Sequence, residues 1–162
     1  MTRLPRAAAA ALALALAAPA AFAGSALQTA TQFMGALQAR DVDAAAALLT
    51  DDVATVLMFH ESGDTAPGAL RRFDGKPATL AYFGGAAERL PRVAFVEVEV
   101  TEGTDGETVF VEARGDMDLV DGRPYANLYV WRLKVEDGRV AHIREYFNPV
   151  TAAQAFGRPT DG

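Results

Sequence analysis

Cysteine is absent from the 162-residue sequence, and histidine occurs only twice. Without cysteine the chain has no disulfide framework, no thiol nucleophile and no lipid anchor after a leader segment. The two histidines, His60 and His142, have no spacing that would assemble a metal site with each other. We therefore expect no metal ion and no cofactor, and a domain that depends on its hydrophobic core alone.

Clusters of positive charge are also scarce. The chain has 15 Lys and Arg residues against 21 Asp and Glu residues, a formal net charge of -6, and no basic cluster longer than Arg71-Arg72. Nucleic acid and anionic membrane surfaces are therefore poor candidate partners, because both attract clustered positive charge. The sequence has no Gly-x-Ser-x-Gly motif and no glycine-rich phosphate loop, so serine-hydrolase and nucleotide chemistry are not indicated.

The N-terminal segment, residues 1–23, has the pattern of a secretory signal peptide. Two early arginines precede an unbroken Ala/Leu run from Ala7 to Ala18, and a small-x-small site ends at Ala23. The run is too short to span the roughly 30 Å hydrocarbon layer of a membrane. We expect cleavage after Ala23, so that residues 24–162 form one domain in the periplasm or outside the cell, without stable membrane insertion. A retained N-terminal anchor is the alternative.

The first half of the remaining chain has helical patterns around one strand. Between Ser25 and Ala39, apolar residues recur at helical spacing behind a serine that can cap the first turn. Pro77 suits the first turn of a later helix, whose Gly84-Gly85 pair indicates close packing or a kink. The expected elements are helices at 25–39, 44–49 and 77–90, a strand at 53–59 and a loop at 61–69.

After Pro91 the pattern changes from helical to strand-like. Short turn segments containing glycine and aspartate separate the strand-like stretches. The expected strands are 92–102, 108–120, 125–135 and 139–147, followed by a short helix or turn at 151–156. This order predicts an α+β fold, with a cone-shaped, curved antiparallel sheet wrapped around the N-terminal helices. The inside of the cone is either filled by side chains or left open as a pocket.

Strand alternation places one carboxylate among aromatic residues. Along the last expected strand Glu145 shares its side with Phe147, and on the strand before it Asn127 shares its side with Tyr129 and Trp131. A carboxylate in such an interior should have a raised pKa, which suits a general acid or base near neutral pH. We therefore expect Glu145 to be catalytic. The alternative is a structural Glu145 that accepts hydrogen bonds from Asn127 or a tyrosine hydroxyl.

Arg114 and Asp116 form a second group of catalytic candidates. They lie on the polar side of the expected strand 108–120, a side that commonly faces solvent, although a bulge at Gly115 could turn both inward. Inside a pocket the arginine would keep the aspartate ionised, and the pair could position a water molecule or a polarised oxygen. Ligand contacts are expected from seven side chains, of which Phe59 and Tyr82 are alternatively core residues: Asn127, Tyr129, Trp131, Phe59, His60, Tyr82 and Phe147.

The C-terminal third of the chain resembles the SnoaL-like branch of the nuclear transport factor 2-like superfamily. The resemblance is carried by the segments 122–131, 137–140 and 144–149, within a similar order of elements over residues 25–156. It implies a cone-shaped α+β barrel, frequently dimeric. Members of the superfamily act as ketosteroid isomerases, polyketide cyclases or epoxide hydrolases, and others only bind a ligand. A homodimer is therefore expected from the resemblance.

Limonene epoxide hydrolase-like members use an Arg-x-Asp pair and an aspartate in an Arg-Asp-Tyr-Phe segment. Arg114-Gly-Asp116 and Glu145 look similar to these groups, but Phe59 and Glu61 stand where those enzymes have a water-holding Tyr and Asn. The segment 144–146 equally resembles phenazine-biosynthesis and cyclase-like members, in which the glutamate lines the ligand cavity.

Together these patterns predict an exported protein that binds a small, largely apolar molecule. Glu145 would act as general acid or base in chemistry of the isomerase, cyclase or hydrolase type, with Asn127, Tyr129 and Trp131 orienting the ligand. The alternative is a non-catalytic carrier or dimerisation module of the same fold, whose interior is filled by Trp131, Tyr129 and Phe147. The volume of the pocket distinguishes the two.

Overall fold

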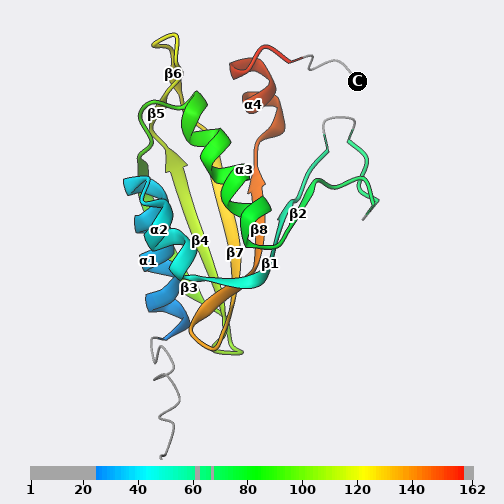
Figure 1. Ribbon diagram of the computed structural model, residues 1–162. Coiled ribbons are helices and arrows are strands. Elements are labelled where there is room, and N and C mark those ends of the chain that lie inside the picture. Colours follow the sequence, from blue (N-terminus) through cyan, green and yellow to red (C-terminus); the bar gives the residue numbers. More distant parts are fainter. Residues whose placement is uncertain (1–24, 61–62, 67, 159–162) are drawn as a thin grey trace, which may run out of the picture.

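The computed structural model describes residues 25–60, 63–66 and 68–158 of the chain. The predicted signal peptide at residues 1–23 lies outside the described residues, so cleavage and export stay predictions. Figure 1 shows a curved sheet with helices packed against it. In the described part of the chain, no helix is long and apolar enough to cross a membrane.

The helices begin at residues that the sequence marks as caps. They are α1 (Ala26–Ala39), α2 (Val42–Ala47), α3 (Lys76–Arg89) and α4 (Pro149–Ala155). Ser25 Oγ accepts a hydrogen bond of 3.2 Å from the Gln28 N–H at the start of α1, and Asp41 accepts one of 2.9 Å from Ala44 at the start of α2. Pro77 occupies the first turn of α3, as predicted.

Six strands form one sheet in the order β2-β1-β8-β7-β4-β3, and two short strands form a second. The strands are β1 (Leu49–Leu57), β2 (Arg72–Asp74), β3 (Phe95–Glu102), β4 (Thr108–Gly115), β5 (Met117–Asp118), β6 (Pro124–Tyr125), β7 (Leu128–Glu136) and β8 (Arg139–Phe147). Strands β3, β4, β7 and β8 form an antiparallel meander, which confirms the predicted order. Strand β1 extends the sheet, parallel to β8 and antiparallel to β2.

Two of the expected strands are divided in the structure. The segment 108–120 contains β4 and β5, and the segment 125–135 contains the end of β6 and most of β7. The first division lies at Asp116, which exchanges backbone hydrogen bonds of 2.8 and 3.2 Å with Ala94, just before β3. The sequence does not predict β2, because three residues are too few to show a periodic pattern.

The hairpin between β7 and β8 contains the predicted tight turn. Asp137 and Gly138 both have positive φ, 48° and 73°, as a type I′ turn requires. The register of this hairpin places Trp131 directly opposite Glu145 on neighbouring strands. The register shifts by one residue between Lys134 and Val135, so the turn and this irregularity together set which side chain of β7 adjoins the end of β8.

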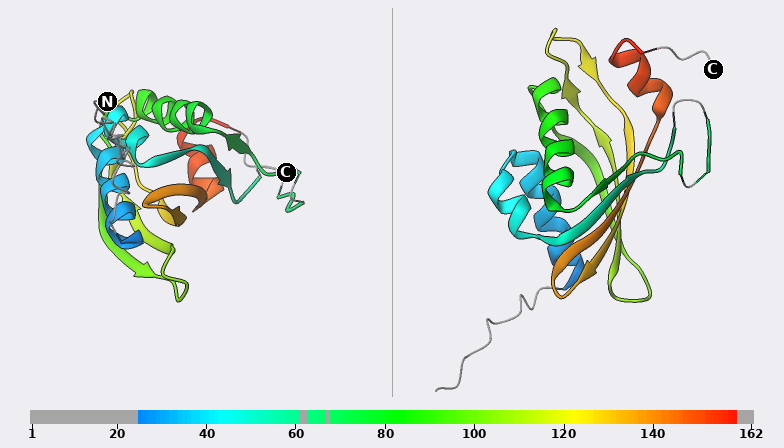
Figure 2. Two further views of the ribbon diagram at one scale, coloured as in Figure 1. Left: turned by 60° about the horizontal axis from the view of Figure 1, so that its bottom comes forward. Right: turned by 45° about the vertical axis from the view of Figure 1, so that its right-hand side comes forward.

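Curvature of the sheet creates the interior of the protein. Figure 2 shows α1, α2 and α3 on one side of the curved sheet, with α4 following the end of β8. Phe33 of α1, Leu133 of β7 and Ile143 of β8 are fully buried in the core. Helix α3 runs unbroken through Gly84 and Gly85, and an added Cβ at either would meet nothing within 4 Å. The prediction of close packing at this glycine pair is therefore wrong.

Candidate functional site

A cavity of about 360 Å³ lies between α3, α4 and the concave side of the sheet. Its volume is within the range of small-molecule sites. Aromatic rings form a large part of its wall and leave it open, so the interior is not packed shut. The rings that line it are Phe73, Tyr82, Phe83, Phe95, Tyr125, Tyr129, Trp131, Phe147 and Phe156.

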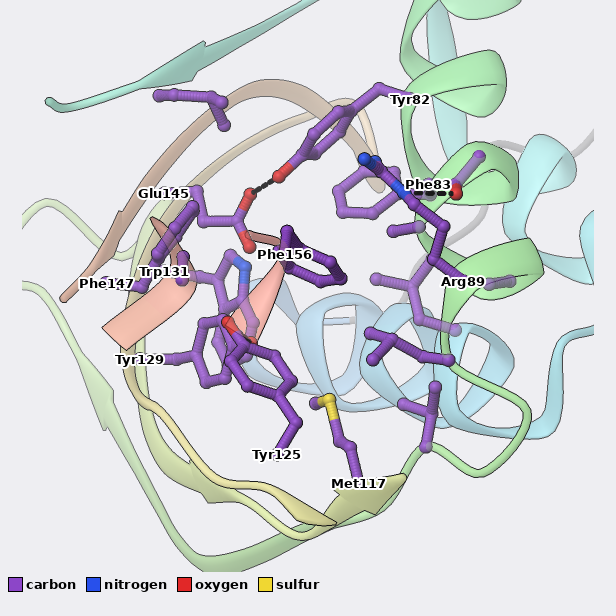
Figure 3. A pocket seen from close by; sticks show the side chains of 18 of the residues that line it. Tyr82, Phe83, Arg89, Met117, Tyr125, Tyr129, Trp131, Glu145, Phe147 and Phe156 are labelled. Atoms are coloured by element: carbon purple, nitrogen blue, oxygen red, sulfur yellow. Dashed lines mark hydrogen bonds between the residues drawn. The ribbon is translucent and has the colours of Figure 1, made fainter. Parts of the chain in front are cut away.

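Glu145 is the carboxylate that lines this cavity (Figure 3). It lies on β8 with 4% of its surface exposed, between Leu57 of β1 and Trp131 of β7. Its direction follows from strand alternation, since Ile143 on the same side is buried and Tyr146 on the other side is exposed. The predicted inward direction of Glu145 is confirmed, and its catalytic role stays a prediction.

Helix α3 brings Tyr82 to Glu145. The Tyr82 hydroxyl donates a hydrogen bond of 2.5 Å to Glu145 Oε2 (Figure 3). The Tyr82 ring stacks on Phe73 with centroids 4.6 Å apart and contacts Phe83 at 5.0 Å. These contacts from two elements hold the hydroxyl in position beside the carboxyl group.

Burial raises the pKa of Glu145 from 4.5 to about 7, because the charged carboxylate loses its hydration. The hydrogen bond from Tyr82 and the indole N–H of Trp131 act in the opposite direction. Burial, and then the neighbouring Glu145, raise the pKa of Tyr82 well above its usual value, so Tyr82 remains a donor. Near neutral pH, Glu145 can therefore exist in either protonation state.

The indole N–H of Trp131 is the second polar group beside Glu145. Trp131 is buried, and its Nε1 makes no hydrogen bond of normal geometry to any described residue. In Figure 3 this nitrogen lies on the side of the ring nearest Glu145. The indole therefore influences the carboxyl group electrostatically without forming a full hydrogen bond to it. This nitrogen has almost no exposed surface, so the indole acts on the site through Glu145.

Tyr129 and Trp131 form a flat wall of the cavity. Their rings are stacked, with centroids 4.9 Å apart and an angle of 5° between their planes. Phe147 lies 5.7 Å from Tyr129 and extends the wall. The structure therefore brings these three predicted ligand residues together around the space beside Glu145.

Asn127 does not line the cavity, contrary to the expectation that it orients a ligand. Its buried side chain donates to Tyr125 Oη at 2.9 Å and to the Asn148 carbonyl at 3.0 Å. Its Oδ1 accepts from the backbone N–H groups of Leu128 and Asn148 at 2.8 and 3.0 Å. All its donors and acceptors thus tie the start of β7 to the end of β8, which is a structural role.

Arg114 and Asp116 do not belong to the cavity either, because the bulge that would turn them inward does not form at Gly115. Both side chains are exposed: Arg114 pairs with Glu97, and Asp116 pairs with Arg92 at 2.9 Å. These pairs hold the pKa of Asp116 below its usual value. The expected catalytic role is therefore corrected: of the two directions that the sequence left open, the polar side of this strand faces solvent.

Phe59 and His60 lie just beyond the end of β1 and do not line the cavity. Phe59 packs edge-on against Phe147, with centroids 4.4 Å apart, and so supports a cavity residue from behind. Glu61, which the resemblance to limonene epoxide hydrolase-like members matches to a water-holding residue, lies outside the described residues. Neither Phe59 nor His60 is therefore in a position to contact a ligand in this cavity.

Sequence reasoning missed several residues that line the cavity, including three arginines. Arg71 precedes β2, Arg89 ends α3 and Arg158 follows α4, and all three line it. Phe156 and Met117 line it as well. No periodic signal marks such positions, because they come from element ends and connections that only the tertiary fold brings together.

The arrangement can bind an apolar molecule and exchange a proton with it. One carboxyl group of near-neutral pKa lies beside two N–H or O–H donors, from Trp131 and Tyr82, in a largely apolar enclosure. In the described part of the chain, no three His, Cys, Asp or Glu side chains lie close enough together to hold a metal ion.

Residues 30–143 match the family model described as the SnoaL-like domain. The uncharacterized protein YesE of Bacillus subtilis is 30% identical over 91 residues, which cover 56% of this chain and 62% of YesE. The match thus spans less than two thirds of the length of that relative.

Solved structures share the fold. A Bacillus subtilis protein provisionally assigned as an isomerase superposes with a TM-score of 0.69 and 24% identity, over 83% of this chain and 94% of that one. A Pseudomonas putida protein provisionally assigned as a polyketide cyclase superposes with a TM-score of 0.65 and 19% identity, over 81% and 97%. Others are described as NTF2-like or ketosteroid isomerase-like. At these identities the likeness concerns the fold alone.

Proposed function

The chain belongs to the SnoaL-like domain family, and we propose that it binds a small, largely apolar molecule and transfers protons to or from it through Glu145. The observation that carries this proposal is the enclosed Glu145 carboxyl group, 2.5 Å from the Tyr82 hydroxyl and lining an open cavity. A titratable group with a pKa of about 7 inside an apolar site suits general acid or base catalysis.

Each polar group has a part in the proposed chemistry. Ionised Glu145 takes a proton from the ligand, and protonated Glu145 returns one to another atom of it. The Tyr82 hydroxyl and the Trp131 N–H both favour the ionised form of Glu145. Such proton transfer fits isomerase or cyclase chemistry. Epoxide hydrolysis has less support, because Arg114 and Asp116 are exposed.

The test begins with a thermal-shift screen of the mature protein against steroid-like, terpenoid and aromatic compounds, followed by turnover assays on those that bind. Glu145→Gln keeps the shape of the side chain but cannot ionise, so we expect binding to persist and turnover to fall at least about 100-fold. Glu112→Gln, on the exposed side of β4, is the matched control. Full turnover by Glu145→Gln would contradict the catalytic role.

A non-catalytic carrier is the second candidate. The hydrogen bond from Tyr82 already satisfies part of the buried carboxyl group, which is also what a structural Glu145 requires. This candidate predicts ligands that bind to wild type and to Glu145→Gln with similar affinity and are recovered unchanged.

We further propose that the protein is exported and cleaved after Ala23. The basic start, the Ala/Leu run and the small-x-small site support this. Expression of the full chain in a Gram-negative host, followed by N-terminal sequencing of the periplasmic protein, should give Gly24 as the first residue. Ala23→Leu should block cleavage, and an intact N-terminus on the wild-type protein would contradict the proposal.

A homodimer through the outer side of the sheet is also proposed. Leu128 and Tyr146 are 67% and 39% exposed there, which leaves apolar surface uncovered. Light scattering should give twice the monomer mass for wild type and the monomer mass for Leu128→Lys. Val120→Lys, an exposed position away from this face, is the control. A monomeric wild-type protein would contradict the proposal.

A further inference from the structure

The cavity is basic although the protein is acidic. Three arginines, Arg71, Arg89 and Arg158, line it, and Glu145 is the carboxylate that lines it with them. The whole chain has a formal net charge of -6. Near neutral pH, where Glu145 is only partly ionised, the described lining therefore carries a net positive charge. A positively charged cleft attracts negatively charged ligands even when the whole chain carries a net negative charge.

Arg89 is positioned to meet a ligand at the rim. Its Nε donates to the Gly85 carbonyl at 3.1 Å, which fixes the side chain along the last turn of α3. Figure 3 shows the guanidinium group turned back toward the cavity. Its charge lies 5.2 Å from the centre of the Phe156 ring. Backbone and aromatic contacts thus orient the guanidinium while leaving its Nη groups open to an acceptor.

Several arginines of the surface have carboxylate partners, whereas Arg89 has none among the described residues. Arg72 pairs with Asp74 at 2.6 Å, and Arg92 pairs with Asp118 at 2.6 Å. Among the described residues no carboxylate pairs with Arg89. A guanidinium group matches a carboxylate in geometry. A ligand with a carboxylate would therefore supply the partner that Arg89 lacks.

A second guanidinium approaches the same place. The guanidinium group of Arg158 lies 6.0 Å from the centre of the Phe156 ring. Phe156 thus has two positive groups near it, Arg89 at the end of α3 and Arg158 after α4. Arg71 is close enough to Tyr82 to favour the charged form of that side chain. Arg71 and Arg89 are exposed and so lie toward the rim, whereas Glu145 lies deep in the interior.

We infer that the ligand is an organic anion with an apolar body, whose carboxylate is held at the rim by Arg89 and Arg158 while the body extends along the aromatic wall toward Glu145. The inference rests on the proposed function, since it names the class of molecule that the proposed pocket takes. This orientation keeps the ligand's negative charge away from Glu145. The reverse orientation would place two carboxylates together in an apolar enclosure, which is disfavoured.

The test compares carboxylates with their uncharged amides. Trp131 is the single tryptophan of the chain and lines the cavity, so its fluorescence reports occupation. The probes are matched pairs with cyclohexyl and adamantyl bodies, such as 1-adamantanecarboxylate and 1-adamantanecarboxamide. We expect the wild-type protein to bind the carboxylates at least about ten-fold more tightly, and the preference to weaken with salt.

Arg89→Gln should reduce the preference for the carboxylate to within about two-fold and leave amide affinity unchanged. Arg158→Gln should reduce it in part. Arg144→Gln removes the same charge from the exposed side of β8 and should keep the full preference. A preference that survives in Arg89→Gln and Arg158→Gln, or equal binding of both probes to wild type, overturns the inference but leaves the pocket proposal standing. Failure of every probe pair to bind overturns both.

Discussion

The hydroxyl of Tyr82 and the carboxyl group of Glu145 come from residues 63 positions apart and are joined by a 2.5 Å hydrogen bond inside the cavity. One comes from a helix and the other from the last strand of the sheet, so the bond connects the two layers of the protein. This hydrogen bond also lowers the pKa of Glu145, and so it partly offsets the increase that burial causes. Several measurable properties depend on this pair and its surroundings.

The stability of the protein should depend on Glu145 ionisation. Its pKa is about 7 in the folded protein against 4.5 for an ordinary glutamate, so the folded state holds a proton that the unfolded chain has lost between these values. Unfolding free energy should therefore fall as pH rises from about 4.5 to about 7, by roughly 3 kcal/mol, and then level off. Urea unfolding across pH 4 to 8 measures this, and Glu145→Gln should lack this component. An equal pH dependence in the variant would contradict it.

Tyr82→Phe should raise the pKa of Glu145 above its value in the wild type. The substitution removes a donor that favours the charged carboxylate but keeps the ring stacked on Phe73. The titration of Glu145, followed by carboxyl-carbon NMR, should shift to higher pH. Tyr146→Phe, on the exposed side of β8, is the control. An unchanged or lowered midpoint would mean that Tyr82 does not donate to the ionised form.

Asn127→Ala should destabilise the fold without altering the ligand preference. The buried amide makes four hydrogen bonds, and its removal takes a partner from the buried Tyr125 hydroxyl and from partly buried backbone groups of Leu128 and Asn148. We expect a loss of roughly 3 kcal/mol in urea unfolding. Carboxylate and amide probes should keep their relative affinities in the folded variant. A large change in this ratio with little loss of stability would restore Asn127 to the binding site.

Gly84→Ala should stabilise the protein by about 1 kcal/mol, because alanine restricts the unfolded chain and favours the helix. The added methyl group meets no atom within 4 Å, and Gly84 does not line the cavity. Thermal and urea unfolding measure the gain. A loss of stability would show that the position needs glycine for a reason other than space.

Arg114→Ala and Asp116→Asn should leave ligand binding and its pH dependence unchanged. Both side chains are about half exposed and paired on the outer side of the sheet, and exposed ion pairs contribute little to stability. Trp131 fluorescence titrations with the carboxylate probes test this. A marked loss of affinity in either variant would place the pair at the site after all.

Much of the fold is predictable from local patterns. The cap at Ser25, the Asp137-Gly138 turn and the alternation along β8 each depend on residues close together in the chain, and each is found in the structure. Alternation also correctly places Glu145 inside, because a pleated strand sends successive side chains to opposite faces. The same rule points Arg114 outward, because no bulge forms at Gly115.

The sequence by itself determined the succession of helices and meander strands, the acidic balance of the chain and the enclosed position of Glu145. The tertiary structure alone decided that Tyr82 reaches Glu145, that β1 lies parallel beside β8, and that Arg89 meets Phe156 at the rim. The reason is physical: periodicity reports which side of an element is buried, whereas contacts between distant elements depend on how the sheet curves and where the helices settle on it.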